Sequence, residues 1–214
     1  MLRIVILGLL VGLAALVGLF THRIVVENRP ITGTAQYYVG GHKLQIERAM
    51  VRSAELRDGG AVNRLDLVLQ WPTLAGAASQ MGTADPANLI FMSLEDATSR
   101  QRSPDDIDPA ERPVELYARF LESDAAPGPG GLVWRKFRKA TPFEGEQLFV
   151  SSPDERQFSA RCPAEGTKTQ DVCLWQTRLD AMDVVVRFQP RHLAEWRHLA
   201  STVRLLVPKF RAGK

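Results

Sequence analysis

The stretch MDVVVRFQPRHLAEWRHLASTVRLLV, Met182 to Val207, places a strand pattern directly before a helix pattern. Residues 182–188 are rich in branched apolar residues, which favour a β-strand. Pro190 suits the first turn of a helix, and Pro208 marks its end. Between the two prolines, apolar residues recur at steps of three or four: Leu193, Trp196, Leu199, Val203 and Leu206. We therefore expect an amphipathic C-terminal helix whose apolar stripe packs on a sheet.

Four more strand candidates come before this stretch, with short turns between them. They are residues 132–137, 146–152, 156–162 and 172–179. Short apolar runs at this spacing are typical of an antiparallel meander. The segment PGPGG at residues 127–131 breaks the chain before them and is the best place for a boundary between two halves of one core.

The first half offers a hairpin followed by a separate strand. Residues 36–39 and 44–50 flank the pair Gly40-Gly41, and two glycines between strand-like runs favour a tight hairpin turn. Residues 64–71 alternate apolar and polar side chains, which predicts a strand with one buried face.

Two more elements are expected before the break. Residues 89–94 form a second apolar strand candidate. Within residues 103–123, prolines and acidic residues precede apolar residues at helical spacing. This order predicts one short amphipathic helix with Pro113 in its first turn.

The N-terminal residues 4–20 read IVILGLLVGLAALVGLF and contain no polar side chain. As a helix, this run spans roughly 26 Å, close to the roughly 30 Å of a bilayer core, and Thr21 and Arg23 can extend it. A soluble helix would need a polar face. A cleaved signal peptide remains an alternative, although the bulky end of the run does not fit a cleavage site. We favour an uncleaved transmembrane anchor over residues 1–23.

Membrane topology follows less directly from the charges, because Arg3 on one flank is balanced by Arg23 and Arg29 on the other. The short N-terminal tail resembles a signal anchor, so we expect residues 24–214 to form a periplasmic α+β domain. The anchor would hold the inner membrane through residues 4–21. Gly8 and Gly12 form a G-x-x-x-G pair that could bring two anchors together as a homodimer.

The two cysteines, Cys162 and Cys173, end one expected strand and begin the next. Neighbouring antiparallel strands bring such positions within the separation that a disulfide requires, and an exported domain would meet an oxidising compartment. Two buried thiols are the alternative. Zinc is disfavoured because no histidine lies close in sequence, and a redox role because the spacing is not C-x-x-C.

Other features give little support for catalysis or for nucleic acid binding. A formal net charge of +3 over 214 residues leaves the chain close to balanced. None of the common catalytic or phosphate-binding motifs is present, so we predict no catalytic, cofactor-binding or metal-ligating residue. His192 and His198 lie six residues apart on the expected helix, point in different directions and are expected at its surface.

Two charged segments have a structural explanation that we prefer to a ligand site. Acidic residues at 105–108, with Glu111, suit the N-terminal end of a helix better than a calcium loop. The segment WRKFRK, residues 134–139, could meet anionic lipid or an acidic partner, but a solvated edge strand guarded by cations is the preferred interpretation.

Five stretches together resemble a group of single-pass bacterial membrane proteins with an N-terminal anchor. They are RLDLVLQWP, GPGGLVW, EGEQLFV, the ARC and CLW pair, and VVVRFQPRHLAEWRHLA. The resemblance covers most of the chain and implies an architecture: an N-terminal transmembrane helix followed by one α+β domain with an antiparallel sheet and a C-terminal amphipathic helix. It implies no activity.

For the function, we expect a non-enzymatic, membrane-anchored periplasmic domain that binds another protein or supports an envelope complex. An immunity-type inhibitor of a toxin that acts in the envelope fits the same architecture. An envelope hydrolase whose site is assembled from scattered residues is the third hypothesis.

Overall fold

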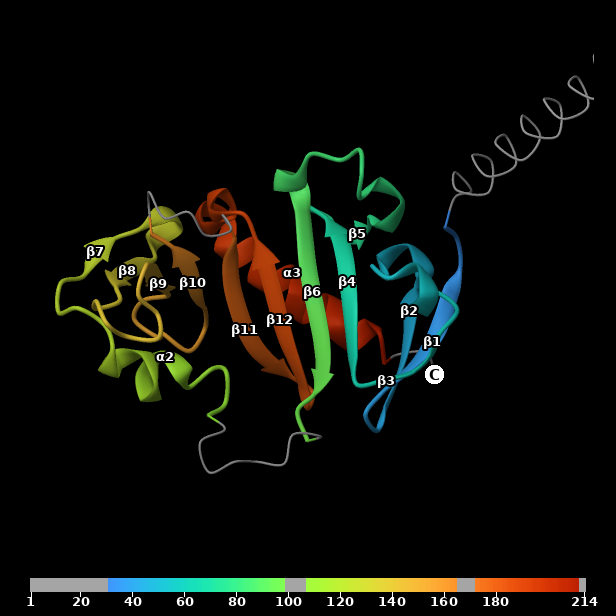
Figure 1. Cartoon of the computed structure of the whole chain (residues 1–214), viewed down its shortest axis with the longest axis horizontal. Helices are drawn as coiled ribbons and strands as arrows, with labels where there is room; N and C mark the ends of the chain where they lie inside the picture. Colours follow the sequence, from blue (N-terminus) through green and yellow to red (C-terminus); the bar gives the residue numbers. More distant parts are fainter. Residues whose placement is uncertain (1–30, 99–106, 165–171, 212–214) are drawn as a thin grey trace, which may run out of the picture. The chain divides into compact units, whose positions relative to one another are not determined.

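Residues 31–98, 107–164 and 172–211 are described by a computed structural model (Figure 1). The expected anchor, with Gly8 and Gly12, lies outside these residues. In the described ranges, no helix has both the length and the apolar character needed to cross a bilayer. Residues 32–214 group into one compact unit, which is a mixed α+β fold with antiparallel sheets and a C-terminal helix.

The main sheet has nine strands in the order β5-β4-β6-β12-β11-β10-β9-β8-β7, and every neighbouring pair is antiparallel. The strands are β4 Arg64–Gln70, β5 Ala75–Gly76, β6 Leu89–Asp96, β7 Ala126–Pro127, β8 Val133–Lys136, β9 Glu146–Val150, β10 Ser159–Pro163, β11 Cys173–Leu179 and β12 Met182–Phe188. The expected boundary at residues 127–131 is wrong, because β7 and β8 on its two sides pair within this one sheet.

A second, three-stranded sheet forms from the first part of the domain, in the order β2-β1-β3. Strands β1 (Thr34–Val39) and β2 (His42–Glu47) make the expected hairpin around Gly40-Gly41. Strand β3 (Gly60–Val62) pairs in parallel with β1. The short 3-10 helices η1 (Arg48–Met50) and η2 (Ala54–Leu56) connect β2 to β3.

The C-terminal helix α3 (Trp196–Lys209) follows the 3-10 helix η7 (Pro190–Glu195) and lies behind the central strands in Figure 1. It continues past Pro208, where we expected it to end. A proline in the last turn removes a single helical hydrogen bond. The N–H groups of Phe210 and Arg211 still donate to the carbonyls of Val207 and Pro208.

The helix expected within residues 103–123 is much shorter than the apolar spacing suggested. Only α2 (Arg112–Glu115) and the 3-10 helix η5 (Tyr117–Arg119) form in its described part. Rings from this segment pack into a small second core, with Tyr117 5.8 Å from Phe137 and 5.2 Å from Phe143 between ring centroids. Packing against the sheet, rather than helix continuation, decides the local backbone.

Three further 3-10 turns complete the domain: η3 (Ala78–Gln80), η4 (Pro86–Asn88) and η6 (Pro129–Gly131).

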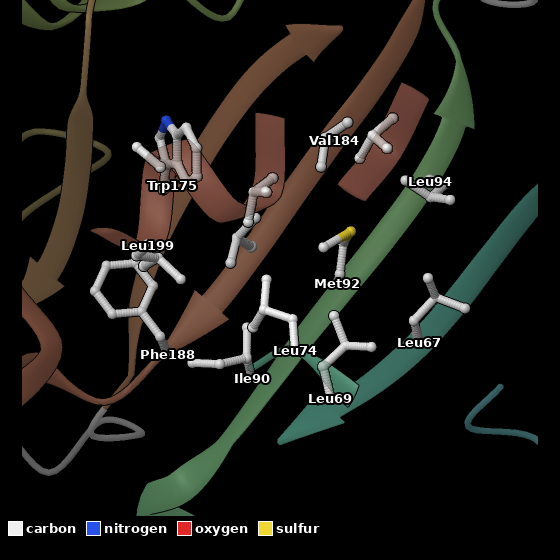
Figure 2. Close-up of a cluster of buried hydrophobic side chains, with 14 of the residues drawn as sticks. Leu67, Leu69, Leu74, Ile90, Met92, Leu94, Trp175, Val184, Phe188 and Leu199 are labelled. Carbon is white, nitrogen blue, oxygen red and sulfur yellow. The ribbon is translucent and has the colours of Figure 1, made fainter. Parts of the chain in front are cut away.

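The main core lies between α3 and the face of the sheet that points toward it (Figure 2). Leu67, Met92 and Val184 come from β4, β6 and β12, and all three are fully buried. Trp175 of β11 lies over the same face at 1% exposure, close to Phe158. The period of two along these strands sends most of the apolar residues to α3, while the opposite face holds the polar residues together with Val68, Phe91 and Val185.

The segment WRKFRK does not form a solvated edge strand. Strand β8 lies between β7 and β9, and Phe137 is buried in the second core. The edge prediction was wrong because the two-residue strand β7, which covers β8, has too little sequence pattern to be recognised.

Cys162 and Cys173 face each other at the ends of β10 and β11 and form a disulfide with a Cα–Cα distance of 4.1 Å. Both residues are buried at 1% or less exposure. The disulfide joins the two strands directly beyond Arg161 and Leu174, the last pair of residues in the β10–β11 ladder. It thereby fixes the position of Val172, the residue that enters β11.

Candidate functional site

The face of the main sheet that points away from α3 carries a charged groove. The residues that line its cavity of about 290 Å³ include Arg52, Arg64, Asp66, Phe91, Ser93, Val172 and Arg187. Register explains the assembly, because Asp66 of β4 lies opposite Ser93 of β6, and Arg187 of β12 lies opposite Phe91 of β6.

Arg52 enters the groove from outside the main strands. Its N–H donates to the carbonyl of Asp66 at 3.0 Å, next to the bridge between Val51 and Leu67. This pairing fixes the η1–η2 connection along β4. Three separate segments of the chain therefore bring the guanidinium groups of Arg52, Arg64 and Arg187 to this groove.

Ser93 holds the floor of the groove together. Ser93 is 3% exposed. Its hydroxyl donates a hydrogen bond to Asp66 Oδ1 at 2.6 Å and accepts one from Arg64 Nη2 at 2.9 Å. Arg187 Nη1 also donates to the hydroxyl oxygen of Ser93, at 3.3 Å. Arg64 Nε also donates to Asp66 Oδ1 at 2.8 Å. The guanidinium group of Arg64 thus donates to Asp66 and Ser93, and these contacts hold the two side chains in place.

The other two arginines are differently placed. The guanidinium carbon of Arg52 lies 5.3 Å from the ring centroid of Phe91, a cation–π contact. Within the described part of the chain, neither Arg52 nor Arg187 has a carboxylate within ion-pair distance. Each lines the groove and keeps N–H donors that make no ion pair with the described carboxylates.

Asp66 keeps its negative charge in this setting. Partial burial raises the pKa of this carboxyl. Hydrogen bonds from Ser93 and Arg64, together with the charges of Arg64 and Arg52, lower it by more, so that the pKa lies below the ordinary 3.8. The carboxylate is therefore ionised at neutral pH and offsets part of the arginine charge.

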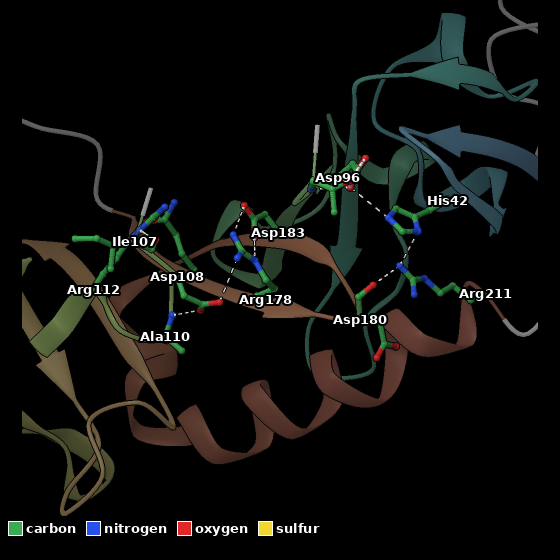
Figure 3. Close-up of polar contacts among 12 residues, drawn as sticks. His42, Asp96, Ile107, Asp108, Ala110, Arg112, Arg178, Asp180, Asp183 and Arg211 are labelled. Atoms are coloured by element: carbon green, nitrogen blue, oxygen red, sulfur yellow. Dashed lines mark hydrogen bonds and ion pairs between the residues drawn. The ribbon is translucent and has the colours of Figure 1, made fainter. Parts of the chain in front are cut away.

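A second polar cluster joins the β1–β2 hairpin, the end of β6 and the end of α3 (Figure 3). His42 Nε2 lies 3.3 Å from Asp96 Oδ1, and Arg211 Nη2 donates to His42 Nδ1 at 3.1 Å. Arg211 also donates to the carbonyl of Asp180. Because both ring nitrogens of His42 are engaged by charged neighbours, this pair lacks the free lone pair that a general base needs.

Asp96 provides a test of the cluster by pH. Burial raises its pKa, but the backbone and side-chain hydrogen bonds from Thr98 and the contact with His42 lower it more, to below the ordinary 3.8. A lowered carboxylate pKa adds stability above that value and loses it as the pH falls below about 4. We expect Asp96→Asn to reduce the free energy of unfolding by about 1–2 kcal/mol at pH 7, and by less at pH 3.

Urea unfolding at both pH values measures this difference. Asp124→Asn is the control, since Asp124 is exposed and its variant should match the parent at both pH values. A loss for Asp96→Asn that is equal at pH 7 and pH 3 would contradict the ionised state of Asp96.

Gly40 is required next to Asp96. It has a φ of +59°, and a Cβ built on it would lie 2.5 Å from Asp96 Cβ. We expect Gly40→Ala to cost about 2 kcal/mol by urea unfolding, from the left-handed backbone and the displaced carboxylate. Gly41→Ala is the matched control, since no atom lies within 4 Å of its added Cβ. If both variants lost the same free energy of unfolding, the loss would come from the turn backbone and not from the contact with Asp96.

The acidic segment is used within the fold rather than for a cation. Asp108 accepts from the N–H of Ala110 at 2.9 Å and pairs with Arg178 at 3.3 Å, and Arg178 also pairs with Asp183 (Figure 3). Glu111 pairs with Arg156 at 2.8 Å. These contacts tie the segment to the sheet. Residues 105 and 106 lie outside the described ranges.

The two histidines of the C-terminal segment meet one aromatic ring, and of the two His198 is exposed as expected whereas His192 is buried. His192 is 3% exposed, its Nε2 lies 2.8 Å from the carbonyl of Ala87, and its ring lies 5.0 Å from that of Trp71. The ring of His198 lies 5.2 Å from that of Trp71 between centroids. Sequence could not reveal this, because Trp71 comes from the end of β4. Over the described ranges, no three potential ligands gather into a metal site.

Comparison with known proteins shows similarity in fold only. No protein-family model and no curated protein sequence matches the chain. One similar solved structure is Smlt3025, an immunity protein of the Stenotrophomonas maltophilia type IV secretion system. It is 13% identical, with a TM-score of 0.56 over 84% of this chain and 93% of that one. An immunity protein thus has this fold.

Another similar structure is the iron-regulated outer membrane lipoprotein FrpD of Neisseria meningitidis. It is 10% identical, with a TM-score of 0.49 over 86% of this chain and 97% of that one.

Sequence reasoning missed the groove residues. The available signal was the polar side of the alternation, since Arg64, Asp66, Ser93 and Arg187 all occupy outward positions on predicted strands. What the pattern lacks is strand order, because nothing local shows that residue 187 lies beside residue 91.

Proposed function

We propose that this chain is an immunity-type binding protein, held at the inner membrane by its N-terminal segment, whose periplasmic domain binds and blocks a toxin that acts in the envelope. The observation that carries the proposal is the groove on the rigid central sheet. There, Arg52 and Arg187 present N–H donors without a carboxylate partner in the described ranges, next to the ring of Phe91. Arginine beside an aromatic ring is a frequent composition of protein-binding surfaces.

Two further observations support this function. The fold is shared with Smlt3025, whose role is that of an immunity protein. The disulfide between Cys162 and Cys173 suits an oxidising compartment such as the periplasm. An inhibitor needs a stable surface rather than a reaction centre, and strands paired on both sides provide one.

The test is protection of growth. Each protein encoded beside this chain is exported to the periplasm of a host that lacks both, with or without co-expression of the full chain. We expect one neighbour to slow growth and the chain to restore it. A chain without residues 1–23, which stays in the cytoplasm, is the control and should not protect. If no exported neighbour is toxic, or if toxicity persists beside the chain, the proposed function is wrong.

A further inference from the structure

The charged groove has a composition that selects a particular kind of ligand. Arg52, Arg64 and Arg187 contribute three positive charges, while Asp66 lines the hollow and Glu95 lies 3.8 Å from Arg64. These described residues leave an excess of one positive charge. A single carboxylate neutralises that excess, whereas a dianion such as phosphate would exceed it and would lie beside the carboxylate of Asp66.

The donors are arranged around Phe91. Arg187 is the register partner of Phe91 across β12 and β6, and Arg52 lies over its ring. Ser93, fixed by Asp66 and Arg64, holds one nitrogen of Arg187 and leaves its other N–H groups available. Two guanidinium groups therefore line the groove together with Phe91, and a carboxylate at the positive edge of that ring can accept charge-assisted hydrogen bonds from them.

The shape of the site indicates that the ligand is a protruding side chain. Ser93, at 3% exposure, is the most buried polar residue that lines the groove, and Val172, which also lines it, precedes the disulfide-bonded Cys173. A flat bilayer surface cannot reach a recessed floor of this kind. A glutamate or aspartate on a loop can, and an apolar neighbour on that loop would cover the edge of Phe91.

We propose that this groove binds a carboxylate side chain from an acidic, partly apolar segment of a protein partner, with Arg52 and Arg187 as the pair of donors beside Phe91. The assignment rests on the proposed function, since the partner in view is the blocked toxin. Arg64 acts as a positioning residue that holds Ser93 and Asp66.

The test uses the full chain in neutral detergent and a short fluorescent peptide in which two glutamates flank a phenylalanine. Fluorescence anisotropy should show saturable binding that weakens with added salt. Arg52→Gln and Arg187→Gln should each weaken it at least about tenfold, which corresponds to the loss of about 1.4 kcal/mol. Arg119→Gln, which removes an exposed arginine from η5, is the matched control and should stay within about twofold.

Three results would overturn the assignment. They are no binding, equal binding of a peptide with glutamines in place of glutamates, and equal weakening by Arg119→Gln. Vesicles with phosphatidylglycerol are tested in parallel, and binding to them that depends on Arg52 and Arg187 would replace the protein segment with a lipid headgroup.

Growth protection separates this inference from the proposed function. A chain that binds the peptide but protects no host keeps the carboxylate groove and loses the inhibitor role. Protection that survives both Arg52→Gln and Arg187→Gln places inhibition on another surface and overturns the groove.

Discussion

Trp175→Ala is expected to lower the free energy of unfolding by about 3–5 kcal/mol. Trp175 is 1% exposed, its ring lies 5.2 Å from that of Phe158, and its strand neighbours are Ala160 and Val186. Removing the indole leaves a cavity between the sheet and α3 that the surrounding close-packed side chains cannot fill (Figure 2). For a domain with a net stability of about 5–15 kcal/mol, the loss is a large share of the total.

Urea unfolding followed by circular dichroism measures this loss. Leu174→Ala is the matched control, because Leu174 precedes Trp175 on the same strand, points to the opposite face and is half-buried. We expect it to cost about 1 kcal/mol. Trp175→Phe should recover most of the stability. If Leu174→Ala cost as much as Trp175→Ala, the core would not lie on the α3 side of β11.

Replacing both cysteines, by Cys162→Ser with Cys173→Ser, is expected to cost about 3 kcal/mol. The disulfide closes a loop with a sequence separation of 11, and its removal gives the unfolded chain more conformational freedom. Two hydroxyl groups would also enter a site that is at most 1% exposed. The measurement is urea unfolding of the parent and the double variant, each with and without a reducing agent.

Reduction provides the internal control for this second prediction. The parent should lose stability when reduced and approach the double variant, while the double variant should not respond. A double variant as stable as the oxidised parent would show that the sheet alone holds β10 against β11.

Local sequence pattern predicts the elements of this fold that have one buried face. Alternation in Arg64–Gln70 and the helical stripe that includes Leu199 and Val203 both describe a surface that must be covered, so their structure follows from their own residues. The same reasoning failed at residues 103–123, where rings pack sideways into a second core instead of continuing a helix. The spacing of apolar residues therefore predicts which side chains are buried better than it predicts which elements cover them.

Strand order is the part of the fold and site that the sequence could not supply. β3 has only three residues and β7 only two, and neither has a period to recognise. The groove depends on Arg52, Asp66 and Arg187 meeting across β4, β6 and β12. Pairing between residues almost a hundred positions apart depends on how much surface the complete sheet buries. A short stretch of sequence does not hold that information.

The position of β12 between β6 and β11 sets a condition on how the protein is made. Among the described strands, residues 182–188 join the two parts of the main sheet, and they leave the ribosome after every other one. Until they arrive, β6 has an unpaired edge and Met92 has no cover, which is the state in which nascent chains aggregate. The main sheet can therefore be completed only when its last strand has been synthesised, so that β6 and β11 stay open to wrong pairing until the end of translation.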